Sequence, residues 1–298
     1  MASIQLYRAF DFRTAQDWDW TITEAVTSRI TIEGGGFKQT FSGAFTYVGI
    51  DRVTGTVTGS SFFENNAEVY RVSDALLDAG RIAQFARNEL DTQQTYAYVL
   101  GGADTITGSA GNDFINGYGG IDTAMYAGSA ASYTLRGSDS SFAVTGAAGS
   151  DTLVNVERLK FADKSIAIDV GANDNGGTIY RLYEAALDRA PDLIGLGFWI
   201  DRLDDGANIV DIAADFIRSA EYTTMYGSVT SNTELVTKYY TNILDRAPDA
   251  GGLAYWSGLL DTGKATTAQV LEAISDSTEN IAAVAPLIAN GFEYVSYG

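Results

Sequence analysis

The chain lacks two residue types that carry much of protein chemistry, because none of its 298 residues is cysteine or histidine. Without cysteine it has no disulfide framework and no thiolate nucleophile. Without histidine it has neither the His-Glu-x-x-His helix of zinc proteases nor a Ser-His-Asp triad. Basic residues are scarce, 19 against 38 acidic ones, and the formal net charge is −19. We therefore expect no nucleic-acid partner, since little here could neutralise phosphates.

Membrane signals are also missing. The sequence contains no apolar run of about eighteen residues, so we expect no transmembrane segment. Residues 1–5 lack the basic region and long apolar core of an amino-terminal secretion signal, so export would need another route. A hydrophobic content of 46% nevertheless favours folded domains over disorder, and the length suggests two or three of them.

A nine-residue repeat occupies residues 99–125 in three consecutive copies. The fourth place is always glycine, the sixth is always aspartate, and the eighth is small or apolar: Gly102, Gly111 and Gly120; Asp104, Asp113 and Asp122; Ile106, Ile115 and Ala124. A fourth copy at 146–154 places Asp151 sixth. One Gly-x-Asp would indicate an ordinary β-turn, but three in strict register favour a repeating structure.

The repeat resembles the calcium-binding nonapeptide of RTX, or hemolysin-type, proteins. The resemblance implies a short parallel β-roll in which each copy forms half a coil and loops two copies apart stack on one side. Asp104 and Asp122 would then share one calcium site, and Asp113 would need a partner on the opposite side. We expect one complete site, with room for a second, and a further ion at the fourth copy.

Calcium takes six to eight oxygen ligands from carboxylates and backbone carbonyls, and glycine-rich loops can turn those carbonyls inward. The first copy has Val99 and Leu100 where Gly-Gly is usual, so its loop could be a cap instead of a full ligand set. The predicted metal ligands are Asp104, Asp113, Asp122, Asp151, Gly101, Ala103, Gly108, Ala110, Asn112, Gly117 and Gly119.

Residues 1–98 are predicted to be a β-rich domain that ends in a helix. Alternating apolar residues and frequent glycines predict strands at 18–22, 29–33, 37–47, 53–58 and 69–72, in a sandwich or irregular roll. Trp18 and Trp20 would share a strand face, as a sugar-stacking platform or, more in keeping with aromatic residues, as part of a core or interface. Ser73 and Asp74 suggest the start of a packing helix that runs to Leu90.

Residues 99–170 are predicted to form the roll with its closing strands. Residues 133–136 and 142–145 predict a hairpin, and residues 155–163 and 165–168 resemble the strand pair that closes many RTX rolls. Glu157 could hold a ligand or a neighbouring arginine, or it could be an exposed strand residue without such a role.

Beyond a polar linker at 171–177, the apolar spacing becomes helical and a second repeat appears. Leu-Asp-Arg-Ala-Pro-Asp occurs at 187–192 and 244–249, and the following Gly-Leu-x-x-Trp recurs at the same offset of 57 residues. Each copy predicts three helices: 179–188, one carrying the tryptophan, and 209–219 in the first; 235–245, one carrying the tryptophan, and 267–275 in the second. The pattern resembles DUF4214, a helical domain of unknown function often found beside RTX repeats.

The acidic loops of this duplication lack EF-hand spacing, so capping explains them better than calcium. Asp192 and Asp249 are predicted N-caps, with Arg189 and Arg246 forming ion pairs within the domain. Small residues at 195 and 252 would let neighbouring helices approach closely. The predicted aromatic core comprises Trp199, Tyr239, Tyr240, Tyr255 and Trp256.

The sequence thus predicts an α+β multidomain protein: a β-rich domain, an RTX β-roll, and a duplicated helical domain over 177–298. The leading hypothesis is a secreted, calcium-binding structural or adhesive protein of a bacterial surface layer or extracellular matrix, which is not an enzyme. Its carboxylates would repel one another until calcium outside the cell allows folding. RTX resemblance implies type I secretion, with residues 290–298 compatible with its signal. Possible partners are further copies of the chain or surface glycans. The alternatives are a carbohydrate-active enzyme or glycan-binding module using carboxylates, and a calcium buffer or sensor.

Overall fold

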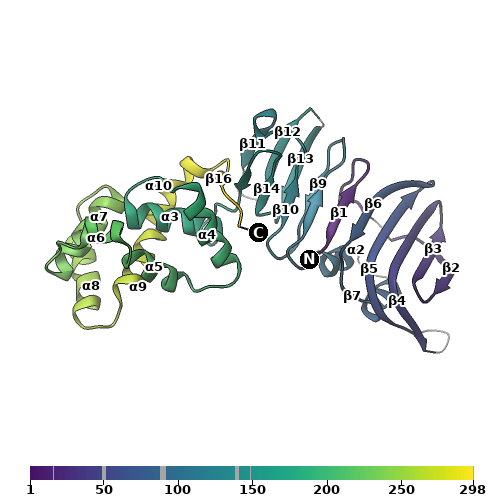
Figure 1. Ribbon diagram of the computed structural model, residues 1–298, viewed down its shortest axis with the longest axis horizontal. Helices are drawn as coiled ribbons and strands as arrows, with labels where there is room; N and C mark the ends of the chain where they lie inside the picture. Colours follow the sequence, from purple (N-terminus) through teal and green to yellow (C-terminus); the bar gives the residue numbers. More distant parts are fainter. Residues whose placement is uncertain (16, 49–51, 88–91, 138–140, 148, 298) are drawn as a thin grey trace. The chain divides into compact units, whose positions relative to one another are not determined.

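The computed structural model describes the whole chain except residues 16, 49–51, 88–91, 138–140, 148 and 298 (Figure 1). It divides into two compact units, Met1–Lys164 and Ser165–Gly298, hereafter the first and second unit. The first unit is rich in strands and the second is mostly helical, which confirms the α+β multidomain class. A separate domain boundary near residue 98 stays a prediction. Within the described ranges, no helix is both long and apolar enough to cross a bilayer.

The larger sheet of the first unit has the strand order β14-β10-β8-β1-β6-β5-β4-β3-β2 (Figure 1). Its amino-terminal strands form an antiparallel series, and β1 joins this series to the roll because it pairs with β6 antiparallel and with β8 parallel. The amino-terminal strands are β1 (Ser3–Leu6), β2 (Thr21–Val26), β3 (Arg29–Gly34), β4 (Phe37–Val48), β5 (Arg52–Glu64), β6 (Ala67–Ser73) and β7 (Leu77–Asp78), which pairs with β5.

Two predictions for this region are wrong. Trp18 and Trp20 share no strand, because β2 begins only at Thr21, and the Trp18 ring packs against Phe37 of β4. The helix predicted from Ser73 begins at Ala79, since Asp74 has a left-handed φ of 57° and the following residues pair with β5. Its predicted end at Leu90 lies outside the described residues. The helices here are α1 (Ala79–Arg87) and α2 (Thr92–Val99), the second of which was not predicted.

The roll consists of two short parallel ladders, with β8 (Thr105–Thr107), β10 (Thr123–Met125) and β14 (Arg158–Lys160) in one and β9 (Phe114–Asn116) and β13 (Gly149–Val154) in the other. The eighth-place side chains point inward, as predicted, and Ile106, Ile115 and Ala124 are at most 1% exposed. Gly120 and Gly149 have φ above 110°, and a Cβ on either would collide with the backbone of the loop beneath it. The fourth-place glycine thus lets the coils stack closely.

The predicted hairpin is present beside the roll. It is formed by β11 (Thr134–Gly137) and β12 (Phe142–Gly146), which pair antiparallel, and β12 also pairs with β13. The turn residues 138–140 lie outside the described residues. A 3-10 turn at Ala130–Ser132 precedes the hairpin, so the chain leaves the roll and returns to it in register for the fourth copy.

The second unit contains two helical repeats and a short pair of strands. Its helices are α3 (Asn175–Leu187), α4 (Leu193–Asp204), α5 (Ile209–Ile217), α6 (Ala220–Tyr226), α7 (Asn232–Leu244), α8 (Ala250–Asp261), α9 (Thr267–Ser275) and α10 (Thr278–Ile288). The strands β15 (Ser165–Ala167) and β16 (Phe292–Tyr294) pair antiparallel. The predicted linker is shorter than expected, because α3 already begins at Asn175.

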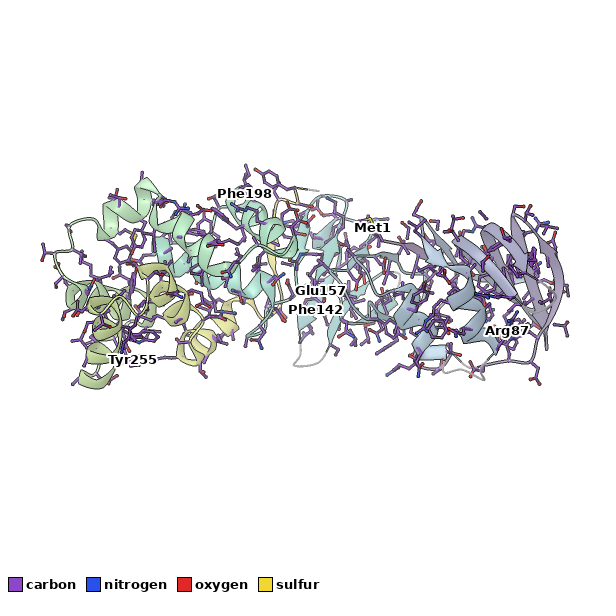
Figure 2. All side chains as sticks on the ribbon, turned by 90° about the horizontal axis from the view of Figure 1, so that it is seen from below. Met1, Arg87, Phe142, Glu157, Phe198 and Tyr255 are labelled. Atoms are coloured by element: carbon purple, nitrogen blue, oxygen red, sulfur yellow. The ribbon has the colours of Figure 1, made fainter. Side chains whose placement is uncertain are left out.

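Most of the predicted aromatic core is correct. Tyr239 and Tyr240 are buried, and Trp199 and Trp256 pack partly buried against the same cluster. Tyr255 is wrong as a core residue, because its side chain is 59% exposed at the surface of α8 (Figure 2). Tyr255 and Trp256 are adjacent residues of α8, and adjacent residues of a helix point in different directions. When Trp256 faces the core, Tyr255 therefore faces the solvent.

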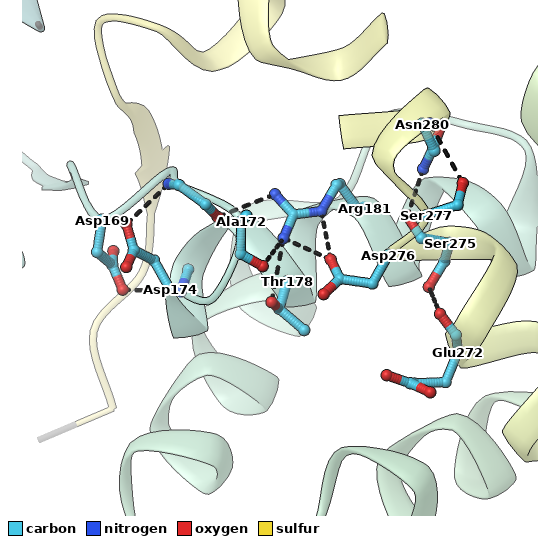
Figure 3. A network of polar contacts seen from close by, with 12 residues as sticks. Asp169, Ala172, Asp174, Thr178, Arg181, Glu272, Ser275, Asp276, Ser277 and Asn280 are labelled. Carbon is cyan, nitrogen blue, oxygen red and sulfur yellow. Dashed lines mark hydrogen bonds and ion pairs between the residues drawn. The ribbon is translucent and has the colours of Figure 1, made fainter. Parts of the chain in front are cut away.

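One buried charge holds the start of α3 to the loop between α9 and α10. Arg181 is 1% exposed and lies 2.5 Å from the carboxylate of Asp276. Its guanidinium also donates to the carbonyl oxygens of Gly171 and Ala172 and to the hydroxyl of Thr178 (Figure 3). Because a buried guanidinium needs partners for its donors, this network fixes the course of the chain into the helical unit.

Candidate calcium centre

On one side of the roll, called the first side, successive carboxylates form a ladder with backbone amides. The Asp104 amide donates to Oδ1 of Asp122 over 2.8 Å, and the Asp122 amide donates to Oε2 of Glu157 over 2.7 Å. At the other end, the Ala2 amide donates to Oδ1 of Asp104. The structure therefore brings Asp104 and Asp122 together in neighbouring coils, at the separation of two copies that the repeat predicted.

On the first side, two carboxylate oxygens have no partner among the described residues. Asp122 is 0% and Asp104 is 3% exposed, yet Oδ2 of each accepts no hydrogen bond from the described residues. Burial raises the pKa of Asp122 to about 8, with a further contribution from the negative charges of Glu157 and Asp104. Burial likewise raises the pKa of Asp104. A buried carboxylate that lacks a partner is costly, and a cation is the group that removes this cost.

The opposite, second side of the roll has the same ladder but different partners. The Asp113 amide donates to Oδ1 of Asp151 over 3.0 Å, and the Phe10 amide donates to Oδ1 of Asp113 over 2.8 Å. Here Oδ2 of Asp113 accepts from the Ser109 amide, and Oδ2 of Asp151 accepts from the Tyr126 hydroxyl. Burial raises the pKa of Asp151. Both oxygens of each second-side aspartate thus have a protein donor, whereas on the first side only Oδ1 of Asp104 and Asp122 has one among the described residues.

Carboxylates alone do not complete a metal site in the described part of the chain, where no group of three or more acidic residues is placed to hold an ion. Backbone carbonyls must supply the other ligands, which suits calcium. Two of the predicted carbonyls are occupied, since Gly108 accepts from Gln5 and Gly117 accepts from the Gly119 amide. The remaining predicted carbonyls accept no hydrogen bond from described residues: Gly101, Ala103, Ala110, Asn112 and Gly119. The Asn112 side chain accepts from the Ser150 amide.

Sequence reasoning left the role of Glu157 open and missed the amino-terminal part of the ladder. Glu157 takes the place of aspartate in the coil after Asp122, and the signal is its spacing, because Leu159 follows two positions later as the apolar residue follows each aspartate. Residues 1–12 form an additional coil without the motif. Ile4 pairs opposite Ile106 in β8, and Phe12 donates to Phe114 beside β9.

Calcium fits the first side best on these observations. Oδ2 of Asp104 and Asp122 and the backbone carbonyls of Gly101, Ala103 and Gly119 would hold the ion, with Glu157 extending the carboxylate ladder. Bound there, calcium would supply positive charge and bridge neighbouring coils, and its binding free energy would add to the stability of the roll. The carboxylates bring the charge, and the buried apolar residues behind them keep the loops in place.

The acidic loops of the second unit are built differently. The carboxylate of Asp192 caps α4 at the Gly195 amide over 2.7 Å, and Asp249 caps α8 at the Gly252 amide over 2.9 Å. The predicted capping role is therefore confirmed. Arg189 and Arg246 form ion pairs with Glu221 and Glu279, respectively.

The small residues of these loops also have the predicted effect. A Cβ at Gly195 would lie 2.9 Å from the hydroxyl of Tyr183 on the preceding helix, and one at Gly252 would meet the hydroxyl of Tyr240. The Tyr183 hydroxyl in turn donates to Asp192. These loops hold two helices together, and in the described residues they contain no buried carboxylate oxygen without a partner.

Comparison with known families agrees with this geometry. Residues 97–124 match the family model of the RTX calcium-binding nonapeptide repeat (4 copies), so the chain carries a calcium-binding repeat whose ion is Ca²⁺. Residues 213–284 match the domain of unknown function DUF4214. Both resemblances are thereby confirmed. Neither matched family is enzymatic, and proteins with RTX repeats are typically exported. Searches of the curated proteins and of the solved structures found no match.

Proposed function

We propose that this chain is an exported structural or adhesive protein of a bacterial surface layer or extracellular matrix, which folds on calcium after export and has no catalytic activity. The observation that carries the proposal is the pair of buried carboxylates on the first side, whose Oδ2 atoms have no partner among the described residues. Such a pair opposes folding until a cation arrives. Calcium outside the cell would therefore act as the folding signal.

We expect the two sides of the roll to contribute unequally to calcium binding. On the first side, Asp104, Asp122 and Glu157 form a continuous ladder of acidic groups, which we assign to calcium. On the second side, Asp113 and Asp151 already have protein donors, so we expect weaker binding there. The helical unit and the amino-terminal sheet would then be presented as interaction modules, toward further copies of the chain or surface glycans.

The decisive experiment is calorimetric titration of calcium into the chelator-treated full chain, with circular dichroism recorded in parallel. We expect calcium to increase β-structure between about micromolar and millimolar concentration, the range that spans calcium sensors and extracellular calcium-binding modules. The variant Asp104→Asn with Asp122→Asn should weaken binding far more than Asp113→Asn with Asp151→Asn. Asp205→Asn, on an exposed helix end, serves as the control.

Unchanged affinity in the Asp104/Asp122 variant would contradict the assignment of the first side. An equally folded chain in excess chelator would contradict calcium-dependent folding itself. The structural role is tested by sedimentation velocity with and without calcium and by a glycan array. A chain that stays monomeric, binds no glycan and turns over a polysaccharide would overturn it.

A further inference from the structure

The first unit contains a large cavity that the calcium sites do not use. Its volume is about 1040 Å³, and it lies between β4, β5 and β6, the helices α1 and α2, and residues from the segments 8–15 and 17–20. Protein interiors are normally close-packed, with few voids larger than a water molecule. A space of this size instead matches the pockets of about 300–1,000 Å³ that hold small molecules.

Aromatic rings form much of the cavity wall. Phe37, Phe62 and Tyr70 stand in a row on neighbouring strands, with ring centroids 5.9 and 5.3 Å apart and planes within 24° of parallel. Trp18 adds a tilted ring 5.6 Å from Phe37, and both Trp18 and Trp20 are half-buried. Aromatic side chains that line a space instead of filling it offer flat apolar surface to a ligand.

The polar groups of the wall are mostly occupied by one another. Gln39 donates to the Ser60 hydroxyl over 2.9 Å, and Tyr70 hydrogen-bonds with Tyr96. Thr92 donates to the carboxylate of Asp17.

Several charged groups at the wall are paired in the same way. Arg8 pairs with Glu64, and the Asp11 carboxylate pairs with Arg13 over 2.7 Å. A polar or charged ligand would have to break such pairs, whereas a neutral apolar ligand would leave them intact. The row of aromatic rings together with these pairs therefore favours an apolar occupant.

The cavity is connected to the roll through residues 1–12. Ile4, Phe10 and Phe12 line the cavity, yet the same segment is the additional coil of the roll. It is anchored by the Ala2 and Phe10 amides, which donate to Oδ1 of Asp104 and Asp113, respectively. Whatever fixes these two carboxylates therefore fixes one wall of the cavity.

We propose that this cavity binds a neutral apolar small molecule, and that calcium in the roll strengthens the binding by ordering the wall formed by residues 1–12. The calcium-dependent part rests on the proposed function, whereas the cavity itself does not. By linkage, the ligand strengthens calcium binding by the same factor. The site would make the amino-terminal sheet a calcium-dependent receptor for an apolar compound.

The test uses the full chain and the fluorescent probe N-phenyl-1-naphthylamine. In saturating calcium we expect saturable binding of one probe per chain, displaced by 1-dodecanol and not by cellohexaose. Thr95→Trp places a large side chain at the cavity wall and should weaken binding by about tenfold or more. Ala97→Trp is the matched control, because Ala97 is exposed on the same helix and does not line the cavity. Ala86→Trp is a second blocking variant, and circular dichroism checks that each variant folds.

Each outcome decides between the parts of the proposal. Calcium binding without probe binding would overturn the cavity and leave the proposed function standing. Probe binding that Thr95→Trp abolishes, in a chain that binds no calcium, would support the cavity and overturn the proposed function. Equal probe affinity in calcium and chelator, in a chain that does bind calcium, would overturn the coupling, for which we expect about a tenfold effect. Displacement by cellohexaose and not by dodecanol would overturn the apolar ligand in favour of a glycan.

Discussion

The roll and the helical unit use aspartate and glutamate in opposite ways. In the helical unit, Asp192 and Asp249 cap helices, while Glu221 and Glu279 pair with arginines, and the pKa of each of these groups is lowered. On the first side of the roll, burial raises the pKa of the carboxylates, and two oxygens have no partner in the described residues. The comparison teaches that an acidic chain can contain one unit whose capping and ion-pairing carboxylates are stabilised by protein groups and another whose buried carboxylates need an external cation.

The largest expected difference between the units is their response to calcium removal. We expect a chelator to abolish hydrogen-exchange protection at 97–125 and 149–160, because unpaired buried carboxylates then repel one another. Protection at 175–288 should persist, since the carboxylates there have protein partners. Hydrogen exchange with mass spectrometry on the full chain measures both units at once. An equal loss of protection in both units would contradict the inference that only the roll depends on calcium.

The two units should also respond oppositely to pH in chelator. In the roll, the pKa of Asp122 is raised from 3.8 to about 8, so its contribution to stability is complete below 3.8 and is lost as pH rises through about 8. In the helical unit, the pKa of Asp192 is lowered, chiefly by the Tyr183 hydrogen bond, so its contribution is present above 3.8 and is lost as pH falls through the lowered value.

Acidification from pH 8 to 5 should therefore stabilise the roll through Asp122 and leave the contribution of Asp192 to the helical unit unchanged, and further acidification should remove that contribution. Tryptophan fluorescence during urea unfolding can separate them. Trp199→Phe with Trp256→Phe leaves only the first unit's reporters, and Trp18→Phe with Trp20→Phe leaves only the second's. A roll that loses stability between pH 8 and 5 would show that its carboxylates are ionised and paired.

Within the helical unit, the largest single effect is expected at the buried ion pair. Asp276→Ala leaves the guanidinium of Arg181 buried without its carboxylate, which should lower the free energy of unfolding by about 3 kcal/mol. Arg218→Ala breaks an exposed pair with Asp215 and should cost at most about 1 kcal/mol. Urea unfolding followed by Trp199 and Trp256 measures both, and neither should depend on calcium. Equal effects would mean that burial does not set the strength of these pairs.

The smallest expected effect concerns the helix caps. Asp192→Ala removes the acceptor for the Gly195 amide and should cost about 1 kcal/mol. Asp205→Ala lies at the opposite end of α4, where a negative charge opposes the helix dipole, and should be neutral or slightly stabilising. Thermal unfolding of the second unit measures the difference. A larger loss at Asp205 would contradict the capping assignment.

Repetition explains which parts of the fold were predictable. The nine-residue register fixed which side chains enter the roll, and Ile106 and Ile115 are both buried as expected. The 57-residue offset likewise located the capped helices, because a cap depends on residues only a few positions away. Most strands of the roll and most helices of the second unit could therefore be predicted from local or periodic sequence signals.

Contacts between distant residues were not predictable in this way. The Ala2 and Phe10 amides meet carboxylates about a hundred positions away, and a backbone donor leaves no trace in residue type. Glu157 was ambiguous because glutamate is common on exposed strands, although its spacing to Leu159 repeats that of the motif. The predicted start of the first helix was wrong because Asp74 is a residue type that often caps helices, whereas its backbone here is left-handed.

The pairing of β1 with β8 also constrains the order in which the polypeptide can acquire structure. Ala2 meets its carboxylate 102 positions later in the sequence, so this side of the roll closes only when two segments far apart in the chain come together. Contacts of such long range delay folding. Closure of the roll at β1 should therefore be among the slower steps of folding.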